Sequence, residues 1–429
     1  MNNVENHVLI HNGTVVTPEA VERADVLIEG ETIAAVGPAL SVPARARIVD
    51  ADGRLVFPGL IDPHVHLREP GGEHKEDFGS GTRAALAGGF TTVLAMPNTQ
   101  PPITDQETLA RTLTLATSKA VCDFGLFVGA TADNTTEVAR LRDAVGLKLY
   151  MGSSTGSLLV ADLAGQIAHF ERYPGVIAIH AEDEETVAHF AEQDTTQGQR
   201  RPPLCAVLAV ARALVLAGHF QRRLHICHVT TEAELALIRD AKERDVPVTC
   251  EVTPHHLFLT TADKNRLGPL GRMNPPLRSR EDVEALWANL DVVDSLATDH
   301  APHTLEEKHS PTPPAGVPGL ETALPLLLTA VHAGKLSLHE IARLTSAGPA
   351  AVYGLPQKGH IAPGYDADLT LVNPDAEWII GERPLFTRCG WSPFEGDKVK
   401  GRVERVFLRG QEVYAHDQVL AQPGYGQAI

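Results

Sequence analysis

Two histidines and an arginine occupy every second position of the stretch "DPHVHLREPG": His64, His66 and Arg68. In a β-strand, residues i and i+2 point to the same face, so both imidazoles would converge on one point. Converging imidazole nitrogens are suitable ligands for a metal such as zinc. The alternative is a pair of partly exposed histidines at a strand end, and this short spacing alone does not decide between the two.

Further polar residues follow other apolar, strand-like segments. His180 occurs in "IAIHAED", His228 in "HICHVTT" and Asp299 in "LATDHAPH". Taken singly, each histidine could be a hydrogen-bonded core residue. Together with His64 and His66 they form a set of nitrogen and oxygen donors that holds zinc and, less often, manganese, iron or cobalt. The set therefore predicts a metal centre.

Lys148 lies inside the apolar segment "VGLKLYMG". An unpaired ammonium group there would cost several kcal/mol or lose its proton. One interpretation is a lysine that extends to solvent at the rim of the fold. The other is a neutral amine that takes up carbon dioxide and becomes a carbamate, an anion whose two oxygens could bridge two metal ions.

The elements that must position these residues alternate between strands and helices from residue 58 to residue 354. Eight apolar segments in this range have the character of strands: "LIDPHVHL", "TTVLAMPN", "CDFGLFVGA", "VGLKLYM", "GVIAIHAE", "LHICHVTT", "PVTCEVTPHH" and "VDSLATDHAPH". Helical stretches such as "EAELALIRDAKERD" separate most of them. This α/β pattern predicts a (β/α)8 TIM-like barrel, with the polar residues at the carboxyl ends of its strands. A doubly wound open sheet would give a similar rhythm, but no GxGxxG turn follows a strand.

The two ends of the chain have a different pattern. Residues 1–57 and 355–429 contain short strand-like runs, and Asn-Gly, Glu-Gly and Asp-Gly turns separate those near the N-terminus. We therefore expect residues 1–57 and 355–429 to form one small composite β-sandwich domain beside a barrel of residues 58–354.

Composition limits the classes of partner. The chain of 429 residues carries 37 basic and 54 acidic residues, a net charge of −17. This balance argues against nucleic acid or an anionic membrane as the main partner. No apolar run approaching the ~20 residues of a membrane span is evident, nor is a signal peptide. The five scattered cysteines suit a reduced, cytoplasmic protein.

Several motifs occur in the order found in one enzyme family. They are "DPHVHLREPG", "AMPNTQPP", "LKLYMG", "IHAE", "CHVTT", "EVTPHHL", "MNPPLRS" and "TDHAPH". In these motifs the chain resembles the dihydroorotases of the amidohydrolase superfamily, in particular their larger bacterial type. This resemblance covers nearly the whole chain. It implies reversible, hydrolytic interconversion of dihydroorotate and N-carbamoyl-L-aspartate, a step of pyrimidine biosynthesis.

The resemblance also implies a centre of two zinc ions. His64 and His66 would hold one ion and His180 and His228 the other, with a carboxylated Lys148 bridging them. Asp299 would ligate the first ion and act as general base. Manganese, cobalt or iron are alternative metals for the same ligands.

Arg68 indicates the substrate class, because its planar fork matches a carboxylate. The alternative is a rim salt bridge with Glu69 or Glu73. The resemblance places further substrate contacts around the arginine: His66, Asn98, Asn274, His303, Ala315 and Gly316. The last two lie in "PAGVPG", which departs from the usual wording of the family.

Two alternatives remain. Allantoinases, hydantoinases and dihydropyrimidinases share the metal ligands, but their rings are neutral and would leave Arg68 without a partner. A non-catalytic dihydroorotase-like scaffold that binds aspartate transcarbamoylase would lack metal ligands. We expect a homo-oligomer with a small-molecule substrate, and the sequence leaves open an association with aspartate transcarbamoylase.

Overall fold

A parallel barrel forms the centre of the protein, which is described here from a computed structural model covering residues 7–43, 45–154, 156–192 and 200–429. The barrel strands are β6 (Leu60–Val65), β7 (Phe90–Ala95), β8 (Asp123–Gly129), β9 (Gly146–Tyr150), β10 (Ile177–His180), β11 (Leu224–Ile226), β12 (Val248–Val252) and β13 (Ser295–Leu296). Each of these described strands except the last, β13, pairs in parallel with the next barrel strand along the chain. The expected (β/α)8 barrel is confirmed.

The barrel is nearly closed between its first and last strands. The amide of His66 donates to the carbonyl of His300 at 2.7 Å, and Val65 bridges to His300 in parallel. The carboxylate of Asp62 accepts from both the hydroxyl and the amide of Thr298. These bonds join the segment with the paired histidines to the segment with Asp299, far apart in sequence.

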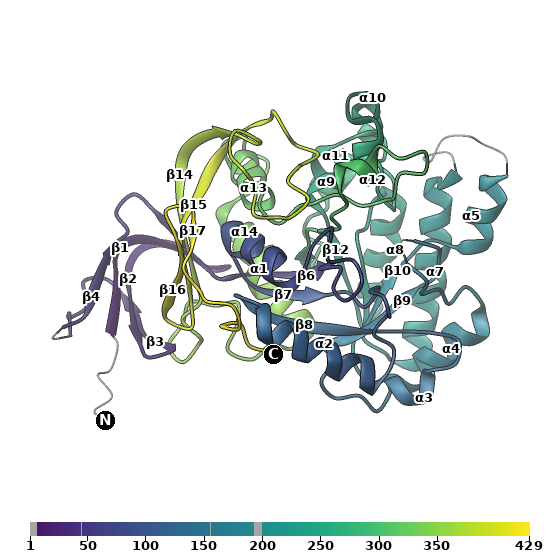
Figure 1. The fold of residues 1–429 in the computed structure, drawn as a ribbon, viewed down its shortest axis with the longest axis horizontal. Helices are drawn as coiled ribbons and strands as arrows, with labels where there is room; N and C mark the ends of the chain where they lie inside the picture. The colour runs from purple at the N-terminus through teal and green to yellow at the C-terminus, as the bar shows by residue number, and fades with distance from the viewer. Residues whose placement is uncertain (1–6, 44, 155, 193–199) are drawn as a thin grey trace.

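Helices surround the barrel (Figure 1). The described helices are α1 (Phe78–Ala87), α2 (Gln106–Lys119), α3 (Thr135–Val138), α4 (Leu163–Arg172), α5 (Glu184–Ala191), α7 (Pro203–Phe220), α8 (Glu232–Glu243), α9 (Pro254–Phe258), α10 (Lys264–Leu267), α11 (Arg280–Ala288), α12 (Leu305–Lys308), α13 (Ala323–His332), α14 (Leu338–Ala342) and α15 (Gly348–Tyr353). Side-chain N-caps fix where many of them begin, for example Asp105 before α2 and Thr231 before α8. The helices cover the outer face, so the strands are buried on both faces and read as apolar runs.

Helix α7 is long and apolar enough to span a membrane by length and composition, which the sequence analysis did not anticipate. In the structure it packs against its neighbours α4, α5 and α8. Cys205, Ala209 and Ala213 are among its buried residues. Part of the apolar character of α7 is therefore explained by its packing as an outer helix of the barrel.

Strands from both ends of the chain form one mixed sheet, which lies at one end of the molecule (Figure 1). Its described strands are β1 (His7–Val16), β2 (Val21–Glu29), β3 (Thr32–Gly37), β4 (Arg47–Asp50), β5 (Leu55–Pro58), β14 (Leu369–Ile379), β15 (Lys398–Leu408), β16 (Gln411–Ala415) and β17 (Gln418–Val419). The two ends of the chain meet where β5 pairs antiparallel with β14. Residues of both ends, such as Val26 and Phe407, share one hydrophobic cluster. As expected, strands from both termini combine, and they do so in one mixed sheet.

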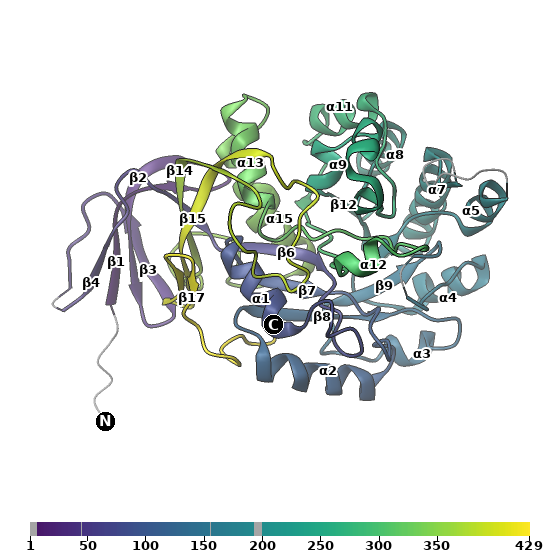
Figure 2. The same ribbon diagram turned by 45° about the horizontal axis from the view of Figure 1, so that its top comes forward.

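Residues 380–397, which connect β14 to β15, leave this sheet and contact the barrel (Figure 2). We call them the β14–β15 segment. The indole Nε1 of Trp391 donates to the carbonyl of His303 at 2.7 Å. The hydroxyl of Thr387 donates to Glu76, whose carboxylate also lies 3.3 Å from Nε2 of His300. The terminal sheet therefore reaches the chain that follows β13.

Candidate metal centre and substrate site

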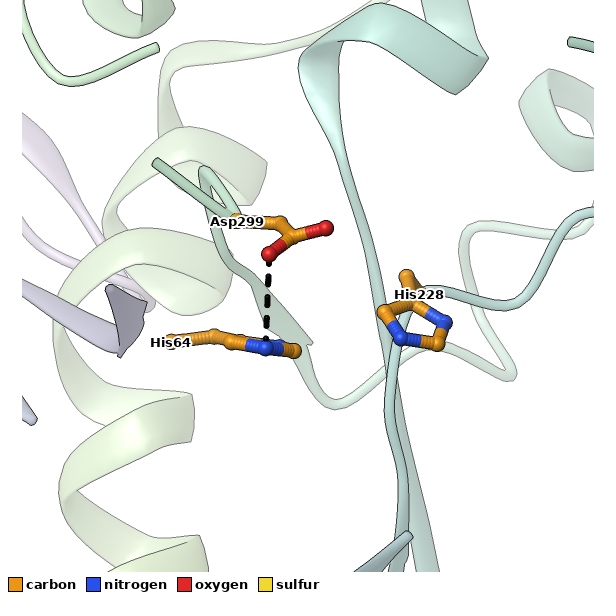
Figure 3. Close-up of side chains that lie close together, drawn as sticks. All are labelled: His64, His228 and Asp299. Carbon is orange, nitrogen blue, oxygen red and sulfur yellow. Dashed lines mark ion pairs between the residues drawn. The ribbon is translucent and has the colours of Figure 1, made fainter. Parts of the chain in front are cut away.

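The predicted ligands come together at the carboxyl ends of the barrel strands. Figure 3 shows His64, His228 and Asp299, whose ligating atoms all lie within 4.8 Å of one another. Oδ1 of Asp299 is 3.4 Å from Nε2 of His64 and 3.1 Å from Nε2 of His66. Nζ of Lys148 is 3.4 Å from the same Nε2 of His64. The residues expected for the first ion thus form one cluster.

The residues expected for the second ion are also neighbours. Nδ1 of His180 lies 3.0 Å from Nε2 of His228, and their rings are 4.9 Å apart. The ring of His228 is 5.4 Å from that of His64. The two histidine pairs therefore adjoin each other.

These distances and the state of the donors fit a metal centre. Two ligands bonded to one tetrahedral zinc ion lie about 3.4 Å apart. Burial lowers the pKa of His66 to about 4 and also lowers the pKa of His180 and of His228. Burial alone would raise the pKa of Asp299, but His64 and His66 hold it well below its usual range. Neutral imidazoles and an ionised carboxylate are the forms that bind metal.

Outer hydrogen bonds fix which nitrogen faces the centre for three of the four imidazoles. Oε1 of Glu251 lies 2.5 Å from Nδ1 of His64, and Oδ1 of Asn98 lies 2.6 Å from Nδ1 of His66. Oε2 of Glu182 lies 3.1 Å from Nε2 of His180. Partners of this kind set the tautomer and orientation of metal-ligating histidines.

Lys148 is fully buried in β9. Its Nζ lies 3.1 Å from Sγ of Cys227, in addition to its contact with His64. No carboxylate forms an ion pair with it in the described ranges of the chain. The interpretation that it reaches solvent at the rim does not apply to a side chain in this position.

Three residues of the cluster and its surroundings have left-handed backbones although none is glycine. The φ angles are 62° for Arg68, 39° for His228 and 45° for Asp299. Such conformations cost of order 1–3 kcal/mol each and persist where the surroundings impose them. All three follow a strand directly or by a few residues, at the point where the backbone turns out of the barrel.

Arg68 is buried beside the predicted metal ligands. Its Nε donates to the carbonyl of Pro302 at 3.1 Å, and its Nη2 lies 3.2 Å from Nε2 of His303. Among the described residues it has no carboxylate partner, and Glu69 pairs instead with Lys119. Burial lowers the pKa of Arg68 to about 10, so the guanidinium remains a cation at neutral pH. The rim salt bridge considered from the sequence is absent from this part of the structure.

The segment after β13 brings the other predicted substrate contacts toward Arg68. The carbonyl of Ala315 lies 3.1 Å from Nε2 of His303. Gly316 has φ 138°, and a Cβ there would lie 2.5 Å from the carbonyl oxygen of Ala301. Its amide donates to the carbonyl of Arg272, two residues before Asn274. Only glycine fits this position without a shift of the backbone.

Sequence reasoning missed several residues of this region. Glu251 is a carboxylate inside the apolar run "VTCEV", the same signal that identified Lys148. It contacts His64 and also His225, at 3.0 Å. Cys227 forms a second possible group of metal donors with His64 and Glu251. Trp391 had no local signal, because it contacts a residue 88 positions away.

Comparisons with known proteins agree with this geometry. Residues 55–413 match the model of the amidohydrolase family. The chain is 48% identical over 375 residues to the multifunctional protein CAD of Squalus acanthias, covering 87% of this chain but only 15% of that protein. It is 39% identical over 371 residues to a dihydroorotase of Pyrococcus furiosus, covering 86% of this chain and 84% of that one.

A solved structure of similar fold is the L-hydantoinase (dihydropyrimidinase) from Arthrobacter aurescens. The TM-score is 0.95 at 30% sequence identity, and the match covers 99% of both chains. The resemblance found in the motifs is therefore confirmed over most of the chain. This chain belongs to the amidohydrolase family.

Proposed function

We propose that this protein is a dihydroorotase, which interconverts dihydroorotate and water with N-carbamoyl-L-aspartate. The observation that carries the assignment is Arg68, a buried guanidinium two residues beyond His66 with no carboxylate partner in the described structure. A buried cation of this kind is costly unless a ligand supplies the anion. The carboxylate of dihydroorotate would supply it, whereas a neutral ring would not.

His303 and Asn98 would complete the substrate site. His303 contacts both Arg68 and the carbonyl of Ala315, so it connects the guanidinium to the segment that contains Gly316. Asn98 uses its side-chain oxygen to orient His66. We assign the carboxylate of the substrate to Arg68 and His303, with Asn98 beside them and Asn274 nearer the ring.

His64, His66, His180, His228, Asp299 and a carboxylated Lys148 would hold two divalent cations, in the first place zinc. Bound there, the cations would polarise the carbonyl of the cyclic amide and lower the pKa of a water molecule. Glu251 and Asn98 hold the two histidines of the first pair in place. Lys148, with no ion-pair partner in the described structure, has the environment that carbon dioxide uptake requires.

Asp299 would move the proton during ring opening. The neighbouring imidazoles of His64 and His66 lower the pKa of Asp299, which favours the ionised carboxylate. Its Oδ1 would accept the proton of the attacking water and deliver it to the leaving amide nitrogen. In ring closure the same atom would carry the proton in the opposite direction.

A cyclic amidase acting on neutral rings is the second candidate, favoured by the close structural match to the L-hydantoinase. It leaves the charge of Arg68 unexplained. The decisive experiment incubates one preparation separately with dihydroorotate, allantoin and hydantoin and counts bound metal in the same sample. Turnover of dihydroorotate with about two metal ions per chain supports the proposal. Turnover of only the neutral rings would reject it, and an empty, inactive protein would indicate a scaffold.

We further propose that the protein acts in the cytoplasm as a homo-oligomer. The net charge of −17 and five free, buried cysteines support a reduced, soluble protein. Because the chain spans only 15% of the multifunctional relative, association with aspartate transcarbamoylase is a separate proposal. Co-elution of the two purified proteins would test it.

A further inference from the structure

Tyr150 faces the interior of the barrel, directly above Lys148 on the same strand. Along β9, Leu147 and Leu149 belong to the hydrophobic core between barrel and helices, so the residues that alternate with them point inward. Lys148 contacts His64, which confirms that direction. Tyr150 is two residues nearer the carboxyl end of the strand, the end where the metal cluster lies.

The surroundings of Tyr150 are those of the reaction site. It is the register partner of His180 on the adjacent strand β10, and the two rings are 5.9 Å apart. Nζ of Lys148 lies 5.4 Å from the centre of the phenol ring. The charges of Asp299 and, less strongly, Arg68 also act on the phenol. The phenol therefore adjoins His180 and Lys148, two of the predicted ligands.

The hydroxyl of Tyr150 is buried and has no hydrogen-bond partner within the described structure. The residue as a whole is only 3% exposed. A buried hydroxyl without a partner costs about 1–3 kcal/mol, a cost that phenylalanine would avoid. A donor kept at this expense next to the predicted ligands indicates that a bound molecule supplies the acceptor.

We infer that Tyr150 is a further catalytic residue of the proposed reaction: its hydroxyl donates a hydrogen bond to the oxygen of the cyclic amide that gains negative charge during ring opening. The inference rests on the proposed dihydroorotase function and names a contact at the reacting amide. The imidazoles of His64 and His228 and the carboxylate of Asp299 lie close together (Figure 3), and Lys148 adjoins His64. A fixed donor at such an oxygen acts mainly in the transition state.

The test compares Tyr150→Phe with Tyr353→Phe in the metal-loaded protein. Tyr353 is a matched control, because its hydroxyl is also buried without a partner in the described residues. Its ring packs against Phe127 and His225, and no ring contact among the described residues joins it to a predicted ligand. For Tyr150→Phe we expect kcat to fall about 10- to 100-fold with KM little changed. Binding of orotate, a planar ground-state analogue, should change less than about twofold.

Stability gives a readout that does not depend on activity. Both substitutions remove an unpartnered buried hydroxyl, so both variants should keep or raise Tm. Only Tyr150→Phe should lose turnover. Equal kcat for the two variants, or a rise in KM alone for Tyr150→Phe, would overturn the inference. A wild-type protein that binds metal but does not turn over dihydroorotate would instead refute the proposed function.

Discussion

Two buried lysines at opposite ends of the barrel have opposite surroundings. Lys358 lies at the amino-terminal ends of the strands, where its Nζ is 2.7 Å from Asp123, 2.9 Å from Asp366 and 2.7 Å from Asp368. Lys148 lies toward the carboxyl ends and contacts an imidazole and a thiol, with no ion pair among the described residues. One lysine has an excess of anions and the other has none.

This difference separates stability from chemistry within one barrel. Lys358 joins β8 to the chain entering β14, and Arg409 adds a second cation to Asp123. A closed, charge-satisfied cluster of this kind holds the terminal sheet to the barrel. An amine without a counter-ion is instead available for modification, and an arginine without one, Arg68, is available for an anionic ligand.

The largest effect is expected from Lys148→Ala. We predict a fall in kcat/KM on the order of 10³-fold, the scale expected when a catalytic group is lost. Bound metal should fall as well, while Tm changes little. Metal analysis and steady-state kinetics on the same sample measure both, and acetate or propionate should restore part of the activity. Full metal content with normal activity would show that Lys148 is not a metal ligand.

Lys358→Met should lower stability and leave activity unchanged, the opposite of Lys148→Ala. Removing the cation leaves Asp366 and Asp368 without an ion pair in the described structure and leaves Asp123 with Arg409 alone. We therefore expect a loss of about 3–5 kcal/mol in the free energy of unfolding. Urea denaturation measures this loss. Activity per folded molecule should stay near the wild-type value, and a selective loss of kcat would contradict a purely structural role.

Arg68→Gln tests the second buried cation without a counter-ion, at the carboxyl ends of the strands. Loss of a charge-assisted contact of about 1.5–3 kcal/mol should lower kcat/KM for dihydroorotate about 10- to 100-fold. Metal content should be retained. Arg343→Gln is the control, since Arg343 binds the carbonyls of Val293 and Leu290 before β13, away from the metal cluster. Equal kinetics for the two variants would remove Arg68 from the substrate site.

The smallest effect concerns pH. Although burial alone would lower the pKa of Lys358, the carboxylates of Asp368 and Asp123 raise it above the ordinary value of 10.5. Its contribution to stability is therefore fully present below pH 10.5 and is lost as the pH rises further. The Tm difference between wild type and Lys358→Met should be constant from pH 7 to about 10 and then narrow. A Tm difference that increases toward alkaline pH would contradict a raised pKa for Lys358.

The barrel and the candidate ligands were predictable because each carries a local signal. Apolar runs ending in His180, His228 or Asp299 give both the strand and the polar end that the fold requires. Lys148 was visible for the same reason. Glu251 carries the same signal, a charged residue inside an apolar strand, and it was overlooked.

Contacts between distant segments were not predictable. The pairing of β5 with β14 and the bond from Trp391 to His303 join residues whose local sequences carry no trace of each other. The first lies within the terminal sheet, and the second depends on how the β14–β15 segment packs against the barrel. The sequence indicated that the two termini share a domain but did not indicate that this domain reaches the site.

The late position of the β14–β15 segment in the sequence determines when its contacts with the barrel can form during synthesis. A ribosome releases His64, Lys148, His228 and Asp299 well before Trp391, the residue that holds the carbonyl of His303. A nascent chain stopped between residues 303 and 391 would possess every candidate metal ligand and still lack this support behind its carboxylate pocket. All the proposed metal ligands are therefore synthesised before the residue that supports the proposed carboxylate site.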